Sequence, residues 1–263
     1  MGAVLSAAHP PATSMLADIS VGDHIQRTVG GLQLNMDTVW ATVAAGAVTI
    51  LLGLLLRRRA TSGVPGKFQL AWETAVTAVR TQIEGSIGPR GRRIVPLALT
   101  LFVFILVCNL FGVLGLGATY DFLIPPTADI NLPLAMALFV IVLVHVASIR
   151  SRGIGGYVKH YLTQPFPIWL MPANLFINVV EEIAKPITLA LRLFGNLLSG
   201  GLMLSLLAYL VVWKIGVIPV GGILALVFNP VWKLFDVLIG VIQAFIFALL
   251  TILYFDVAMS DVH

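Results

Sequence analysis

The amino-acid sequence predicts an all-α integral membrane protein. Of its 263 residues, 59% are hydrophobic and only 11% are charged, whereas soluble domains carry about 25% charged residues. A soluble protein of this size could not cover its surface with so few charges. The apolar residues also gather in long runs, and a membrane-spanning helix needs about 20 of them.

Five segments have the length and composition of membrane spans. They occupy residues 38–56, 94–116, 132–149, 173–212 and 217–257. Together with the N-terminal segment 1–37, they make a single membrane domain over residues 1–263. Residues 66–88 differ, because their apolar residues recur at helical spacing among charged ones. This pattern predicts an amphipathic helix on the membrane surface.

The last two segments are longer than a bilayer requires. Each holds about 40 residues and would be about 60 Å long as a helix, while the bilayer core is about 30 Å thick. We expect two long, tilted helices packed as a hairpin, with Pro186 and Pro230 as candidate bends. The alternative is that each segment is a re-entrant pair.

The distribution of basic residues predicts the orientation. The connection between the first and second spans holds eight basic residues, Arg57, Arg58, Arg59, Lys67, Arg80, Arg90, Arg92 and Arg93. The connection after the third span adds Arg150, Arg152 and Lys159, while the loop between the second and third spans has none. By the positive-inside rule the basic connections are cytoplasmic. The N-terminus is then outside and the C-terminus is cytoplasmic.

A stripe of polar residues follows one face of the fourth span. Spaced three or four residues apart, it comprises Glu181, Lys185, Thr188, Arg192, Asn196 and Ser199. Polar residues in a membrane helix face protein or water rather than lipid.

Arg192 lies near the middle of this helix and stays charged when buried. A charge at the bilayer centre costs about 2.5–3.5 kcal/mol even by the lowest scales. Arg192 therefore requires a carboxylate partner or a hydrated pocket. A static salt bridge inside this chain is one alternative.

The fifth span carries a second stripe at the same spacing. It comprises Asn229, Lys233, Asp236, Gly240, Gln243 and Phe247. Antiparallel to the fourth span, it would bring Asp236 and Gln243 beside the first stripe and form a polar path through the bilayer. An ion pair of Asp236 with Lys233 or Arg192, without a transport role, is the alternative.

Three further residues are possible channel-wall positions: Asn109, Glu182 and His145. Histidine is the side chain whose charge most readily changes near neutral pH, although a satisfied interfacial histidine is the simpler interpretation of His145. No nucleotide-binding loop, catalytic triad, metal-ligand cluster or nucleic-acid module is present in the sequence. We expect no catalytic site, no metal and no cofactor.

Several motifs resemble subunit a of the bacterial F-type ATP synthase. They are "NLFGVLG", "PTADINLPLAMAL", "MPANLFINVVEEIAKP", "KPITLALRLFGNLLSG" and "IQAFIFALLTILYF", in this order. The resemblance covers the chain from about residue 94 to the C-terminus. Its arginine–asparagine and glutamine–aromatic motifs are the most specific.

The resemblance implies a proton-translocating stator subunit beside a ring of c subunits. Two aqueous half-channels would reach the ring carboxylates, with Arg192 between them, and Asn196, Gln243 and Glu181 match the family's polar residues. The implied partners are the c-ring, b-type peripheral stalk subunits, the catalytic head indirectly and the lipid bilayer, with no nucleic acid. The implied location is the bacterial plasma membrane, in a multi-pass arrangement.

The sequence departs from the family pattern at three positions. Some members have glutamate where this chain has Gly201, and histidine or glutamate where it has Asp236. We infer that Asp236 supplies the acid that Gly201 cannot. Another acid of some members is Gly112 here.

Two other classes of function compete with this one. A secondary transporter with a binding site at Arg192 predicts an internal repeat and broken helices, and the sequence has no such repeat. A purely structural membrane scaffold leaves both polar stripes unexplained.

Overall fold

A computed structural model describes residues 26–29, 32–61, 63, 66–86, 94–113, 125–163, 166–211 and 220–259. Some predicted positions lie outside this part of the chain. They are residues 1–25 and 30–31 of the N-terminal segment, 87–88 of the surface helix, 114–116 of the second span, 212 of the fourth and 217–219 of the fifth.

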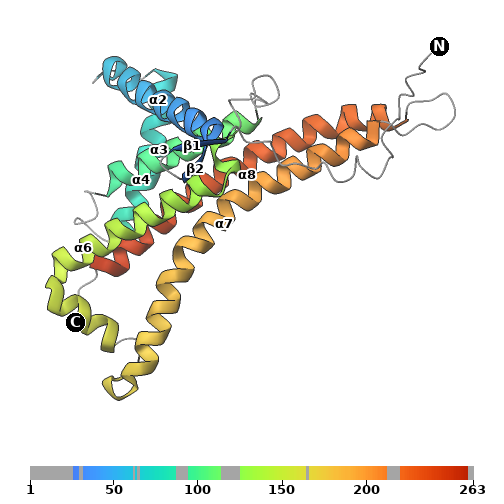
Figure 1. Ribbon diagram of the computed structural model, residues 1–263. Helices are drawn as coiled ribbons and strands as arrows, with labels where there is room; N and C mark the ends of the chain where they lie inside the picture. Colours follow the sequence, from blue (N-terminus) through green and yellow to red (C-terminus); the bar gives the residue numbers. More distant parts are fainter. Residues whose placement is uncertain are drawn as a thin grey trace, which may run out of the picture.

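Helices dominate the structure (Figure 1). The α-helices are α2 (Met36–Arg59), α3 (Lys67–Ser86), α4 (Val95–Val113), α6 (Asn131–Thr163), α7 (Met171–Val211) and α8 (Val220–Met259). Two short 3₁₀ helices, η2 (Pro126–Ala128) and η3 (Ile168–Leu170), precede α6 and α7. In the described part of the chain four helices, α2, α4, α6 and α8, are long and apolar enough to cross a membrane. The prediction of an all-α membrane protein is confirmed, while a fifth crossing by α7 stays a prediction.

The chain also has a small β-hairpin that the sequence analysis missed. Strands β1 (Gln26–Val29) and β2 (Leu32–Asn35) are antiparallel, with Gln26 opposite Asn35. Gly30-Gly31 stands between them in the sequence, and such a pair is a known signal of a two-residue hairpin turn. The hairpin leads directly into α2.

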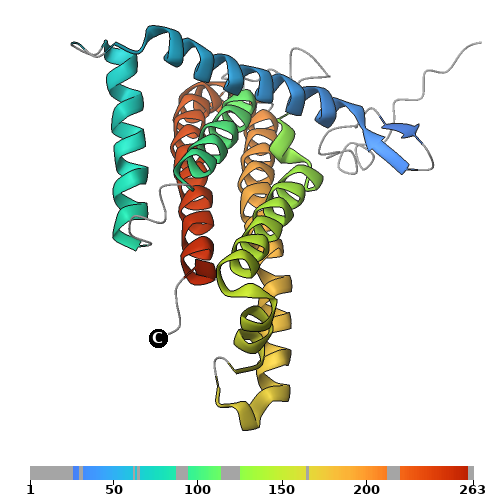
Figure 2. The same cartoon turned by 90° about the vertical axis from the view of Figure 1, so that its left-hand side faces the viewer.

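The long helices α7 and α8 run side by side in opposite directions, and α7 changes direction along its length (Figure 1). Pro186 lies inside α7 and Pro230 inside α8. Helix α4 packs on α8, and α6 packs on both long helices. Helix α2 instead lies across the other helices (Figure 2). If α2 crosses the bilayer, α7 and α8 therefore run obliquely through the membrane. An oblique path agrees with their length, which exceeds the thickness of the bilayer core.

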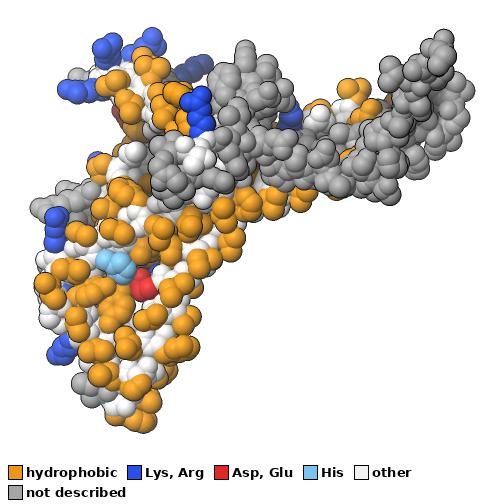
Figure 3. All heavy atoms as spheres, in the orientation of Figure 1, with side chains coloured by type: hydrophobic (Ala, Val, Ile, Leu, Met, Phe, Trp, Pro, Cys, Tyr) orange, Lys and Arg blue, Asp and Glu red, His pale blue; other side chains and the backbone are white. Residues whose placement is uncertain are grey.

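The core lies where α4, α6, α7 and α8 meet. Its largest cluster of buried side chains is Leu101, Ile105, Met136, Ala137, Val140, Leu189, Leu193, Ala244 and Phe247. Outside this core the surface stays apolar, as Figure 3 shows for one face. Trp40 and Leu226, for example, are 58% and 76% exposed. An apolar exterior of this extent is favourable only in contact with lipid or other protein.

Helix α6 continues beyond the predicted third span and forms much of the connection that follows. It breaks at Gly153, whose φ of 72° and ψ of 166° are not helical. Glycine alone adopts this conformation readily. The sequence shows that this connection is rich in glycine. It does not show that the connection is helical both before and after Gly153.

We expect Gly153→Ala to lower stability by about 1–3 kcal/mol, because a Cβ is strained in this backbone conformation. No described atom lies within 4 Å of the added Cβ, so steric contact does not confuse the result. Gly155→Ala is the matched control, with equally open space and no positive φ. The apparent Tm in detergent checks this. Equal Tm values for the two variants would contradict it.

Candidate functional site

The polar stripe of α7 divides into three parts in the structure. At its N-terminal end Lys185 Nζ pairs with Glu181 at 3.0 Å and with Glu182 at 2.9 Å. The Thr188 and Ser199 hydroxyls donate to carbonyls of their own helix, those of Ala184 and Gly195. Both hydroxyl-bearing side chains are exposed, so their oxygens stay accessible from outside the chain.

Arg192 occupies the middle of the stripe, and its side chain is exposed. It makes no hydrogen bond or ion pair with any residue that the structure describes. Asn196, one turn further, is half-buried and likewise has no hydrogen-bond partner among those residues. The static internal salt bridge considered for Arg192 is therefore not formed within the described part of the chain.

Asp236 of α8 lies against Gly200 of α7. Its two carboxylate oxygens would be 3.1 and 3.3 Å from a Cβ built on Gly200. The glycine that makes room for the acid is thus Gly200. Its neighbour Gly201 is exposed, and a Cβ added there would meet no described atom within 4 Å. Within the described residues Asp236 pairs with neither Lys233 nor Arg192.

The C-terminal half of the α8 stripe, Gly240, Gln243 and Phe247, is buried, while Asn229 and Lys233 are exposed. Gln243 is 6% exposed, and its Nε2 is buried without a hydrogen-bond partner among the described residues. Leu193 of α7 and Ala244 of α8 belong to the same core cluster. Together with the Asp236–Gly200 contact, this register brings Gln243 level with the turn of α7 that carries Arg192.

Asn109 of α4 joins three elements. Its Nδ2 donates to the carbonyl of Gly240 on α8 at 3.0 Å, and its Oδ1 accepts from the Thr127 hydroxyl of η2 at 3.3 Å. Both ends of the amide are therefore engaged, which favours a positioning role over a free channel wall.

Gly112 shows why an acid is absent one turn after Asn109. A Cβ at this position would lie 3.1 Å from Pro125 Cγ and 3.2 Å from Leu197 Cδ2. A carboxylate side chain would have to displace one of these groups. The tight packing around Gly112 is thus consistent with the absence of an acid at this position.

Glu182 is the centre of a polar cluster that the sequence only hinted at. Its carboxylate accepts from Tyr161 at 2.8 Å and from Lys185 at 2.9 Å, and lies 3.2 Å from His145 Nε2. His145 Nδ1 is in turn 3.2 Å from the Tyr157 hydroxyl. The cluster, comprising His145, Tyr157, Tyr161, Glu181, Glu182 and Lys185, links α6 to α7.

Sequence reasoning missed the tyrosines of this Glu182 cluster. Tyr157 and Tyr161 are four residues apart, so they share a helix face. That spacing was a usable signal, but the connection was not expected to be helical. Tyr254 of α8 adds its ring 5.7 Å from Lys185 Nζ, in the range of a cation–π contact.

Arg192 thus lies between two acidic positions along α7. Glu182 precedes it by ten residues, about 15 Å of helix, and Gly200, where Asp236 lies, follows it by eight, about 12 Å. Among the described residues His, Cys, Asp and Glu side chains form no group of three able to hold a metal ion.

The fold and these positions define a class: a multi-pass helical membrane protein with charged residues gathered along two paired helices. A family model described as "ATP synthase A chain" matches residues 38–256. The chain is 47% identical to ATP synthase subunit a of Acidothermus cellulolyticus, over 94% of this chain and 85% of that protein. It is 43% identical to subunit a of Mycobacterium bovis, over 94% and 96%, and 44% identical to that of Mycobacterium leprae, over 92% and 94%. The chain belongs to the ATP synthase A chain family, which confirms the resemblance seen in its motifs.

We expect Gly240→Ala to lower stability by about 1–3 kcal/mol through overpacking. The added Cβ would lie 3.2 Å from Asn109 Cβ and would separate α4 from α8. Gly195→Ala, which meets no described atom within 4 Å, is the control and keeps or raises the Tm. A Gly240→Ala variant as stable as Gly195→Ala in detergent would show that α4 and α8 are not closely packed there.

Proposed function

We propose that this chain is the proton-translocating stator subunit of the membrane sector of a rotary ATP synthase. Membership of the ATP synthase A chain family supports this function in general. The observation that carries the specific mechanism is an exposed Arg192 with no ion-pair partner among the described residues, between the two acidic positions Glu182 and Asp236. The chain has no catalytic site of its own in this proposal and acts as a component of the translocating complex.

The missing partner of Arg192 is a carboxylate on another subunit. An exposed guanidinium in an apolar membrane helix is unfavourable alone, and a ring of c subunits would bring a succession of carboxylates past it. Each attraction forms and then breaks as the ring turns. Hydration of Arg192 keeps the pairing from becoming too strong, because a fully desolvated pair with good geometry is costly to separate.

The two acidic positions serve the two half-channels. The Glu182 cluster lies toward the N-terminal end of α7, next to the connection predicted to be cytoplasmic. Asp236 lies toward the opposite end of α7, against Gly200. A fixed cation between them repels a proton passing directly from one to the other, so protons must travel on the ring. Asn196, Gln243, Thr188 and Ser199 supply polar groups near this barrier.

Two contacts support the predicted topology. The side chains of Asn35 and Thr38, at the start of α2, donate to Asp129 at 2.7 and 2.9 Å. Asn35 and Asp129 are predicted to be external, and Thr38 begins the first predicted span. Arg152, in a predicted cytoplasmic connection, donates to the carbonyl of Val257 near the C-terminus at 2.9 Å. Each contact joins two parts of the chain expected on the same side. Multi-pass insertion in the bacterial plasma membrane, with the N-terminus outside, fits both.

The remaining partners follow from the same assignment. A stator must be held against rotation, which b-type peripheral stalk subunits provide, with the catalytic head attached indirectly. We expect no nucleic-acid partner. The driving force is about 2.3 kcal/mol per proton for each 100 mV of membrane potential.

Arg192→Ala is expected to abolish both ATP synthesis and ATP-driven proton pumping, because nothing then attracts the ring carboxylate or blocks proton leakage. The complex should still assemble, since Arg192 holds no described residue in place. Arg150→Ala, an exposed arginine away from the polar stripe, is the control. Pumping assays in membrane vesicles check this, and normal coupled pumping by Arg192→Ala would refute the mechanism.

Asp236→Asn is expected to slow passive proton flow by about tenfold or more, because an amide cannot relay a proton as a carboxylate does. The amide has nearly the same shape, so packing on Gly200 is kept. Asp236→Glu should retain most of the flow. Measurement uses vesicles stripped of the catalytic head, and unchanged conductance in Asp236→Asn would remove Asp236 from the pathway.

A further inference from the structure

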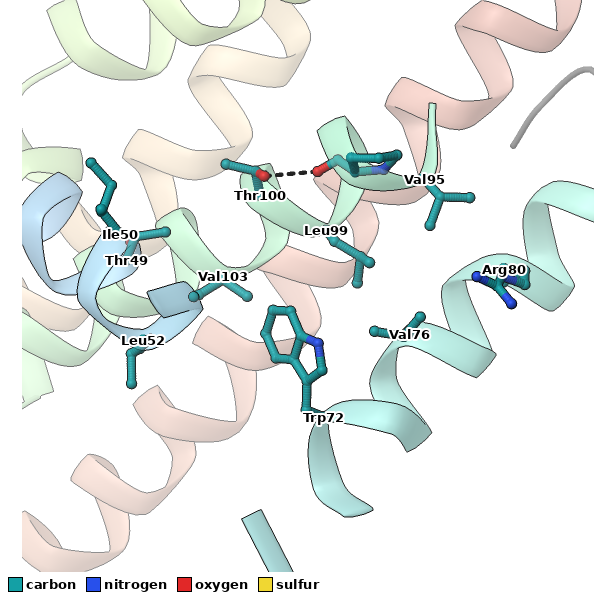
Figure 4. A pocket seen from close by; sticks show the side chains of 12 residues that line it. Thr49, Ile50, Leu52, Trp72, Val76, Arg80, Val95, Leu99, Thr100 and Val103 are labelled. Carbon is teal, nitrogen blue, oxygen red and sulfur yellow. Dashed lines mark hydrogen bonds between the residues drawn. The ribbon is translucent and has the colours of Figure 1, made fainter. Parts of the chain in front are cut away.

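A cleft lies between α2, α3 and α4. Its volume is about 500 Å³, within the range of about 300–1,000 Å³ typical of ligand pockets. Figure 4 shows Trp72 and Val76 of α3 pointing toward Leu99 and Val103 of α4, and residues 49–53 of α2 line the third side. Nearly all of the wall is apolar.

The cleft has few polar groups, and they differ in whether they already have hydrogen-bond partners. The hydroxyls of Thr49 and Thr100 donate to Ala45 and Pro96, within their own helices. Arg80 is the cation of the lining, at the end near Val95 (Figure 4). It is exposed and makes no hydrogen bond or ion pair with any part of the chain that the structure describes.

We propose that this cleft binds one anionic phospholipid, with an acyl chain between α3 and α4 and the phosphate at Arg80. The apolar wall of the cleft matches the acyl chain of this ligand. Arg80, a cation without a partner in the described chain, matches its phosphate. An α-helix of a partner is about 10–12 Å across with its side chains, and the cleft volume would hold only about one turn of it. A narrow, flexible acyl chain fits the same space.

The position of the cation agrees with a lipid of the cytoplasmic leaflet. Arg80 lies beside Val95 and Pro96 at the start of α4. The segment just before α4 holds Arg90, Arg92 and Arg93 in the sequence, in a connection predicted to be cytoplasmic. A juxtamembrane basic side chain attracts anionic headgroups. The Trp72 ring supplies the flat apolar surface on which the acyl chain packs.

The test uses the full-length chain in phosphatidylcholine vesicles containing a trace of phosphatidylglycerol with a photoreactive acyl chain. A second sample carries photoreactive phosphatidylcholine instead. After illumination, labelled peptides are mapped by mass spectrometry. We expect phosphatidylglycerol to label the segments around Trp72–Val76 and Leu99–Val103 preferentially.

Two variants separate the headgroup from the acyl chain. Arg80→Gln should lower phosphatidylglycerol labelling about fivefold and leave phosphatidylcholine labelling unchanged, while Lys67→Gln on the same helix changes neither. Gly53→Leu should fill the cleft and reduce both labels. A Cβ at Gly53 meets no described atom within 4 Å, and the same holds for Gly46 of α2, so Gly46→Leu is the matched control.

Three results would overturn the proposal. The first is an unchanged ratio of the two labels in Arg80→Gln, and the second is labelling spread evenly over all lipid-facing helices. The third is loss of cleft labelling in the assembled complex with labelling kept in the isolated chain, because a partner subunit would then occupy the cleft. None of these outcomes bears on proton transport, so the two proposals fail independently.

Discussion

A permanent cation in an apolar helix constrains everything around it. The guanidinium of Arg192 cannot discharge its proton as a buried lysine can, and the described part of the chain offers it no carboxylate. Its stability must therefore come from water or from another subunit. This requirement explains why the polar stripe of α7 faces outward at Arg192 while the neighbouring Leu189 and Leu193 face the core. The proposed stator function, in which a moving carboxylate pairs with Arg192 and then leaves it, requires such an incomplete site.

Glycines set the geometry on which this site depends. Asp236 reaches α7 because Gly200 has no side chain, and Asn109 reaches the backbone of α8 because Gly240 has none. These close approaches fix the register of α8 against both α7 and α4. A rigid scaffold of this kind holds the acids at set distances from Arg192, so that in the proposed mechanism only the ring moves. The Glu182 cluster does the same on the other side through hydrogen bonds to α6.

Periodicity predicted much of this arrangement. Three- and four-residue spacing gathered the stripe residues on one face, and charge distribution gave a topology with which the Asp129 and Arg152 contacts agree. Tertiary contacts were harder to predict. The role of Gly200 rather than Gly201, the tyrosines around Glu182 and the buried Gln243 amide depend on helix rotation and register, which single-helix patterns do not contain. The hairpin at residues 26–35 was missed because its strands are very short, although a Gly-Gly pair, a known signal of a hairpin, stands between them in the sequence.

The proposed separation of two aqueous paths by Arg192 can be tested directly by side-specific accessibility. Cys108 is the only cysteine and is buried, so a Cys108→Ala background can carry Thr188→Cys or Ser199→Cys, on opposite sides of Arg192. A membrane-impermeant thiol reagent is then applied to right-side-out or inverted vesicles containing the assembled complex. We expect Thr188→Cys to be labelled from the cytoplasmic side and Ser199→Cys from the external side. Labelling of both positions from the same side would contradict it.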